Sequence, residues 1–191
     1  TLGILWSALA PLFLLITMDI VFGAFFGLNL PHYTIYLFSG LLLFNYFSNI
    51  TRNSMSVLYI NAPIYSKVPV PKLYFLFSHS VANFIDFLVS LAVFFVFVAI
   101  DGITFKANFF LLIYPIICLF FCSLYIFFRD ISYLWPVICR IIMYSSAIFY
   151  DAAILPGLLR RLLTCNPLYM CIDYFRQLII HSTVPSPAYH I

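Results

Sequence analysis

The stretch LYFLFSHSVANFIDFLVSLAVFFVFVAI, residues 73–100, decides the fold of this chain. It is almost entirely apolar, with one charged residue, Asp86, and one histidine, His79, inside it. A helix needs about 20 mostly apolar residues to cross the hydrocarbon core of a bilayer, and this stretch is longer than that. It therefore predicts a transmembrane helix that carries an acidic side chain deep within it.

The composition of the whole chain agrees with a membrane environment. Hydrophobic residues make up 65% of the 191 residues, charged residues make up 8%, and the mean hydropathy is +1.10. A water-soluble domain usually carries about a quarter charged residues, so this composition argues against a soluble globule. The net charge of +3 and the lack of a Lys/Arg-rich run also argue against nucleic acid as a partner.

The apolar stretches predict an all-α integral membrane protein, with one transmembrane domain over residues 1–191. Five spans are predicted, over residues 4–28, 33–51, 73–100, 109–128 and 132–150. The apolar run within residues 166–180 is too short to cross a bilayer and predicts a re-entrant or interfacial helix. Because the chain does not begin with Met, we expect it to be an excerpt that is truncated at both ends.

The orientation of the spans is predicted from their loops. Lys and Arg are enriched in short cytoplasmic loops, but here each side carries four, so the count alone does not decide. The early loops usually weigh most, and Lys67 and Lys72 both lie between the second and third spans. We therefore expect the loop over residues 52–72 to be cytoplasmic and the tail after Asp151 to face outward.

Three charged residues lie in or beside the later spans. Arg129 and Asp130, in FFRDISYLW (127–135), follow the fourth span, where charges reach headgroups and water at modest cost. An ordinary helix-end pair that fixes the depth of the span is the simpler interpretation. Arg140 lies inside the fifth span, and an intramembrane Arg is a functional candidate unless it snorkels or pairs with Asp19 or Asp86.

Six motifs occur in one order along the chain: LGILWSALAPL (2–12), GLLLFNYFSN (40–49), NAPIYSKVPVP (61–71), FFRDISYLW (127–135), SSAIFYD (145–151) and NPLYMCIDYFRQLI (166–179). Together they resemble the membrane subunits of type 2 ABC exporters that move polysaccharides. The resemblance covers nearly the whole chain. It implies six spans in the full chain, a preceding amphipathic helix, and a homodimer that works with two copies of a separate ATPase. This chain departs from that pattern at both ends and in a short fourth span.

The resemblance also implies roles for particular residues. The loop over residues 61–71 resembles the element that contacts the ATPase, and its prolines make it stiff. The headgroup of a lipid-linked substrate would meet the inner mouth of the path, where Arg suits phosphate. A plain connecting loop is the alternative for the first site. The candidates are Asn61, Lys67, Val68, Pro69 and Pro71 for coupling, and Arg129, Asp130 and Arg140 for the inner mouth.

Aromatic side chains are candidates for the lining of the path. Sugar rings have apolar faces that pack on aromatic rings, and a Tyr hydroxyl hydrogen-bonds sugar hydroxyls. The alternative is that Phe faces lipid and that Tyr and Trp form interfacial belts. The candidates are Tyr33, Tyr36, Phe44, Tyr46, Phe47, Tyr144 and Tyr150.

The tail resembles re-entrant helices at the outer face of this family. Asn166 suits the N-cap of a helix and Pro167 its first turn, while the spacing of Asp173 and Arg176 permits an ion pair. An interfacial helix without a gating role is the alternative. The candidates of this segment are Asn166, Pro167, Tyr169, Asp173 and Arg176.

No catalytic or metal-binding pattern occurs in the sequence, so we expect a transport subunit rather than an enzyme. Cys165 and Cys171 are close enough in sequence to pair. No cofactor is expected in this chain, because ATP and Mg would be bound by the partner subunit.

The predicted function is the permease of an ABC exporter for a lipid-linked polysaccharide, such as O-antigen, capsule or a teichoic-type polymer, in a bacterial inner membrane. The predicted partners are the ATP-binding subunit, a second copy of this chain, the lipid-linked glycan and membrane lipids. Three alternatives remain open. They are a related exporter of a drug or lipo-oligosaccharide, a membrane glycosyltransferase or polymerase, and a secondary transporter.

Overall fold

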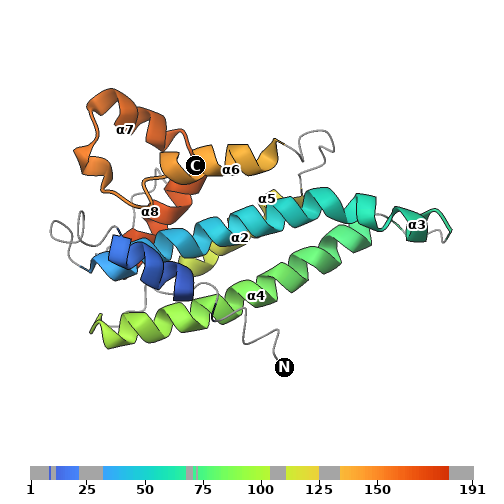
Figure 1. The fold of residues 1–191 in the computed structure, drawn as a ribbon, viewed down its shortest axis with the longest axis horizontal. Coiled ribbons are helices and arrows are strands. Elements are labelled where there is room, and N and C mark those ends of the chain that lie inside the picture. Colours follow the sequence, from blue (N-terminus) through green and yellow to red (C-terminus); the bar gives the residue numbers. More distant parts are fainter. Residues whose placement is uncertain are drawn as a thin grey trace.

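Two long antiparallel helices form the body of the molecule (Figure 1). They are α2 (Tyr33–Ile60) and α4 (Leu73–Ile100). The computed structural model describes residues 9, 12–21, 32–67, 71, 73–103, 111–124 and 134–180, and all regular secondary structure in these ranges is helical. The short helix α3 (Ala62–Tyr65) lies at the far end of the pair, where α2 ends and α4 begins.

Aromatic side chains join α2 to α4. The ring of Phe38 meets the rings of Phe94 and Phe97 edge-on, with centroids 5.4 and 5.7 Å apart. About two helical turns further along α2, the rings of Tyr46 and Phe87 are 4.4 Å apart. Such pairs contribute about 0.5–1.5 kcal/mol each beyond the area they bury. Inside a membrane this close packing matters more than burial, because lipid is as apolar as the helices themselves.

One helix in the described part of the chain, Tyr74–Ile100, is long and apolar enough to cross a membrane. The prediction of five spans is therefore not confirmed. α2 is as long as α4 and continues well past residue 51, where the second span was predicted to end. α5 (Ile113–Leu124) has 12 residues and α6 (Trp135–Ser145) has 11, both shorter than the predicted spans over 109–128 and 132–150.

α6 ends early because the chain turns sharply after it. Ser146 caps the helix, with its hydroxyl donating to the carbonyl of Ile142 at 2.6 Å, and Ala147 follows with φ 48°. This left-handed conformation costs a residue with a Cβ roughly 1–2 kcal/mol of free energy, so contacts elsewhere must hold Ala147 there. The segment from Ser146 to Phe149 is buried, and we call residues 146–150 the buried turn.

Three short elements follow the buried turn: the 3-10 helix Ala152–Ile154, α7 (Gly157–Thr164) and α8 (Pro167–Ile179). The prediction of Asn166 as the N-cap of α8 is confirmed, since its side-chain oxygen accepts from the backbone N–H of Leu168 at 3.0 Å. Pro167 lies in the first turn, as predicted. α8 packs into the main core, where Phe175 contacts Phe94 of α4 at 5.6 Å between centroids.

Cysteines contribute no cross-link in the described part of the chain. Cys165 and Cys171, which the sequence allowed to pair, form no disulfide, and neither do Cys118 and Cys139. The connection between α7 and α8 therefore depends on the cap of Asn166 and on packing. The small cluster of Ala147, Leu163 and Tyr169 supplies that packing.

Candidate functional site: the Arg176 anchor

A buried arginine joins three separate parts of the chain. Arg176 lies on α8 and is only 3% exposed. Its Nη1 donates to the carbonyl of Ala147 at 2.9 Å, and its Nη2 donates to the carbonyls of Ile148 and Tyr36 at 3.1 and 3.0 Å. Its Nε donates to the carbonyl of Tyr36 and the hydroxyl of Ser39, both at 3.3 Å. We call Arg176 and these four partners the Arg176 anchor.

Two tyrosines of α2 also bind the buried turn. The hydroxyl of Tyr36 donates to the carbonyls of Ala147 and Tyr150 at 3.1 and 2.8 Å. The hydroxyl of Tyr33 donates to the backbone carbonyl of Phe149 at 3.2 Å. With Arg176 bound to Ile148, all four consecutive carbonyls from 147 to 150 accept a side-chain hydrogen bond. These bonds hold Ala147 in its unfavourable conformation, because the turn presents its carbonyls to donors rather than to another helix turn.

A glycine makes room for the guanidinium. A Cβ at Gly40 would lie 2.7 Å from Nη2 of Arg176 and 3.1 Å from the side chain of Ile148. Both distances are shorter than normal van der Waals contact, so a larger residue would push α8 and the buried turn away from α2. The glycine therefore permits the close approach of α2 to the anchor.

The charge of Arg176 is balanced by dipoles in direct contact. Burial lowers the pKa of the Arg176 guanidinium from its ordinary value, and the carboxylates of Asp173 and Asp151 act in the opposite direction. An arginine stays protonated in proteins, so the anchor holds a buried cation. Hydrogen bonds that involve an ionised group contribute about 1.5–3 kcal/mol each, which offsets the loss of hydration.

The anchor uses only two of the residues predicted for the site. Arg176 was predicted on the outer segment and Tyr36 on the aromatic path, whereas Ser39, Ala147 and Ile148 were not predicted. The hydrogen bonds of Arg176 go to α2 and the buried turn instead of to Asp173, which accepts from Gln177 at 2.8 Å. A glycine inside an apolar helix was the sequence signal for close approach at this place.

The other outer residues surround the anchor. The amide of Asn166 donates to the hydroxyl of Ser146 at 2.9 Å, which fixes the start of α8 to the buried turn. Pro167 is exposed at the first turn of α8, and Tyr169 is buried against Ala147 and Leu163. The outer segment is thus one packed unit with the buried turn.

The predicted aromatic lining does not form a single surface within the described chain. Phe44 and Tyr46 are buried in the core, and Phe47 lies 6.4 Å from Trp135 between ring centroids. Tyr144 is 60% exposed on α6. The hydroxyl of Tyr150 donates to the carbonyl of Tyr144 at 2.9 Å, so Tyr150 belongs to the buried turn.

The coupling candidates lie at the opposite end of α2 from the anchor (Figure 1). The amide of Asn61 donates to the carbonyl of Val57 at 2.8 Å and ends α2, and Lys67 is exposed beyond α3. Pro71 is exposed before α4, whereas Val68 and Pro69 lie outside the described residues. The two candidate sites are thus joined by the whole of one helix.

The inner-mouth candidates are only partly described. Arg129 and Asp130 lie outside the described residues. Arg140 is exposed on α6 and forms no ion pair with Asp19 or Asp86 in the described part of the chain. The hydroxyl of Thr34 donates to the carboxylate of Asp19 at 3.1 Å instead.

An apolar helix of membrane length and the high share of hydrophobic residues are typical of a helical membrane protein. Comparison with known proteins narrows this class. The chain is 26% identical, over an alignment of 193 residues, to the O-antigen export system permease protein RfbA of Klebsiella pneumoniae, and the alignment covers 96% of this chain and 74% of that protein.

A second permease of the same name and organism is 25% identical over 95% of this chain and 74% of its own length. No family model matches the chain. The two relatives confirm the resemblance to the permease subunits of ABC exporters that the six motifs had indicated.

Proposed function

We propose that this chain is the membrane subunit of an ABC exporter that passes a lipid-linked polysaccharide across a bacterial inner membrane. A separate ATP-binding subunit drives the export, and the chain acts as a homodimer. One observation carries the proposal: the similarity to two O-antigen export permeases extends over 96 and 95% of the chain. The apolar helix Tyr74–Ile100 supports the membrane location.

The arrangement of α2 suggests how the partner acts on the outer end. α2 has 28 residues, which corresponds to about 42 Å of helix. One of its ends precedes the loop that contains Asn61 and Lys67, and the other carries Tyr36 and Ser39 of the Arg176 anchor. A continuous helix transmits a displacement along its length. Movement of the loop against the ATPase would therefore displace α8 and the buried turn.

The anchor gives α8 its role in this mechanism. Because Arg176 binds α2 and the buried turn at once, α8, α2 and the buried turn move together as long as these hydrogen bonds hold. We propose that α8 closes the outer end of the path and that the anchor sets its position. In this role Arg176 is a positioning residue, since its hydrogen bonds go to protein oxygens of α2 and the buried turn.

The same architecture also suits an exporter of a drug or lipo-oligosaccharide, and a membrane glycosyltransferase is the alternative from another class. Co-purification separates an exporter of either kind from the glycosyltransferase. The full-length chain, tagged and extracted in mild detergent, is expected to bring an ATP-binding subunit with it. Lys67→Glu and Pro69→Ala are expected to release that subunit, whereas Lys106→Glu, in the predicted outer loop, is expected to retain it.

Loss of surface polysaccharide in cells that lack the chain identifies the substrate. Restoration by the wild-type gene is the control. A chain that purifies alone when its candidate ATPases are co-expressed, in cells whose polysaccharide is unchanged by its loss, contradicts the proposal. The enzyme and secondary-transporter alternatives would then be favoured.

A further inference from the structure

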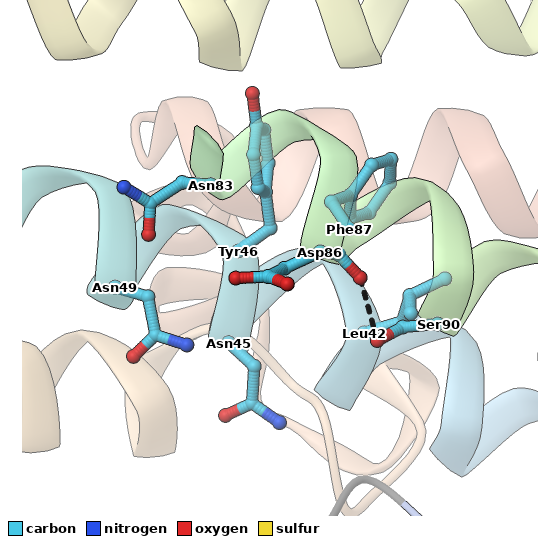
Figure 2. Close-up of a pocket in the computed structure, with 8 residues that line it drawn as sticks. All are labelled: Leu42, Asn45, Tyr46, Asn49, Asn83, Asp86, Phe87 and Ser90. Atoms are coloured by element: carbon cyan, nitrogen blue, oxygen red, sulfur yellow. Dashed lines mark hydrogen bonds between the residues drawn. The ribbon is translucent and has the colours of Figure 1, made fainter. Parts of the chain in front are cut away.

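A small polar cavity opens between α2 and α4 (Figure 2). Its volume is about 70 Å³. Five polar side chains line it: Asn45 and Asn49 of α2, and Asn83, Asp86 and Ser90 of α4. We call these five residues the polar seam. The Arg176 anchor and the coupling loop do not include any of them.

The polar seam lies at the middle of both helices. Asp86 is the fourteenth of the 28 residues of the apolar helix α4, and Asn45 and Asn49 flank the midpoint of α2. Asp86 and Asn49 are both exposed on the surface of the helix pair. A carboxylate at this depth is strongly disfavoured against lipid, so the seam must face polar groups in the working protein.

The walls of the cavity differ in how firmly they are held. The amide of Asn83 donates to the carbonyl of His79 at 2.7 Å, and its oxygen accepts from Asn53 at 2.8 Å. Within the described part of the chain, the side chains of Asn45 and Asn49 make no such bond. Figure 2 shows the carboxylate of Asp86 directed into the space between Asn45, Asn49 and Asn83. One wall is thus fixed, and the other offers two amides to a ligand.

The chemistry of the cavity matches a neutral sugar. A carboxylate accepts hydrogen bonds from hydroxyl groups, while an Asn amide both donates and accepts. The buried rings of Tyr46 and Phe87 line the apolar side of the cavity, with centroids 4.4 Å apart. Sites that bury a whole small molecule usually have about 300–1,000 Å³, so this cavity suits only one edge of a ring.

We propose that the polar seam binds the hydroxyl edge of a neutral sugar residue of the exported polymer. This inference rests on the proposed function. It adds a binding site for the glycan halfway across the membrane, besides the predicted headgroup site at the inner mouth. The small volume and the open mouth keep the binding weak, which permits the polymer to advance. A second copy of this chain is the other polar surface that could cover the seam, and the test separates the two.

The first test is photocrosslinking in the full-length chain with its ATPase subunit, in cells that make the polymer. Benzoylphenylalanine replaces Asn49 in the seam or, as the matched control, Leu88, which lies two residues from Asp86 on α4, is exposed and does not line the cavity. After irradiation we expect polymer attached to the chain from position 49 and none above background from position 88. Attachment of equal yield from both positions, or chain-to-chain adducts alone from position 49, would overturn the proposal.

The second test is the export rate of seam variants that still bind the ATPase subunit. Asp86→Leu removes the hydroxyl acceptor, and we expect export to fall about tenfold. Asp86→Asn keeps hydrogen-bonding capacity and is expected to retain more than half of the rate, as is the control Leu88→Ala. Asp86→Leu with an unchanged export rate overturns the proposal.

Cells that lack the chain separate the two levels of inference. If these cells export polymer normally, the proposed function itself fails. If they do not export while Asp86→Leu exports at the wild-type rate, the sugar site fails and the exporter remains.

Discussion

The guanidinium of Arg176 lies over the ring of Tyr36, with its Cζ 3.4 Å from the ring centroid, and also donates to the backbone carbonyl of the same tyrosine. The two residues are 140 positions apart in the sequence. This contact between α8 and α2 brings together a cation–π interaction and charged hydrogen bonds around a buried guanidinium. It makes Arg176 the point where the outer elements are joined to the long helices.

Replacement of Arg176 tests the anchor. Arg176→Met removes the charged donors from the carbonyls of Tyr36, Ala147 and Ile148. The Ala147 carbonyl keeps the Tyr36 hydroxyl and the Tyr36 carbonyl keeps the Ser39 hydroxyl, so the buried carbonyl of Ile148 is the one left without its donor. Each lost hydrogen bond to a charged group costs about 1.5–3 kcal/mol, so we expect the free energy of unfolding to fall by at least about 3 kcal/mol. Titration with denaturing detergent measures it. Arg176→Lys is expected to lose less, and an unchanged stability for Arg176→Met would contradict the anchor.

The hydroxyl of Tyr36 tests the buried turn separately from the cation. Tyr36→Phe keeps the ring under Arg176 but removes the bonds to the carbonyls of Ala147 and Tyr150. We expect a loss of about 1–3 kcal/mol and faster hydrogen exchange in the buried turn. Tyr36→Leu is expected to lose more, because the cation–π contact goes as well. Equal stability of the Phe and Leu variants would show that the ring contributes nothing.

The glycine prediction has a matched control in the same chain. Gly40→Ala places a Cβ 2.7 Å from the guanidinium, and we expect a loss of about 1–3 kcal/mol through overpacking. A Cβ at Gly157, in α7, meets nothing within 4 Å, so Gly157→Ala is expected to leave the stability unchanged or raise it slightly. Thermal unfolding of both variants in one detergent makes the comparison. A stable Gly40→Ala variant would mean that α2 and α8 can move apart freely.

The cap of α8 can be divided into its two hydrogen bonds. Asn166→Ala removes the bond from Leu168 and the bond to Ser146, and we expect a loss of about 1 kcal/mol. Asn166→Asp keeps the cap acceptor but loses the amide donor, so it is expected to retain most of the stability. Hydrogen exchange at the backbone of Leu168 measures the cap directly. Fast exchange in both variants would assign the effect to Ser146 rather than to capping.

The sequence alone was sufficient for the class of fold and for several local features. An apolar run such as residues 73–100 has few ways to satisfy its backbone in lipid other than as a helix, so α4 begins and ends at the residues predicted for the third span. The cap of Asn166 and the place of Pro167 also follow from local chemistry, because a side-chain acceptor and a missing N–H act within one helix turn.

Composition alone could not set the ends of the other helices. The run from Ser132 to Tyr150 has no charged residue apart from Arg140, yet α6 ends at Ser145. Its end depends on donors from Tyr33, Tyr36 and Arg176, which lie far away in the sequence. α2 differs, because its end is local: it continues to Ile60 since no residue before Asn61 and Pro63 interrupts its hydrogen bonds.

The sequence by itself determined a helical membrane protein, the start of α8 and the resemblance to export permeases. Only the tertiary structure decided that Arg176 turns away from Asp173, that Gly40 receives its guanidinium, and that Asn45, Asn49 and Asp86 share one cavity. The physical reason is that helix formation depends on neighbours within a few residues. A buried cation or a polar cavity instead depends on oxygens and amides that only the packing of separate helices brings together.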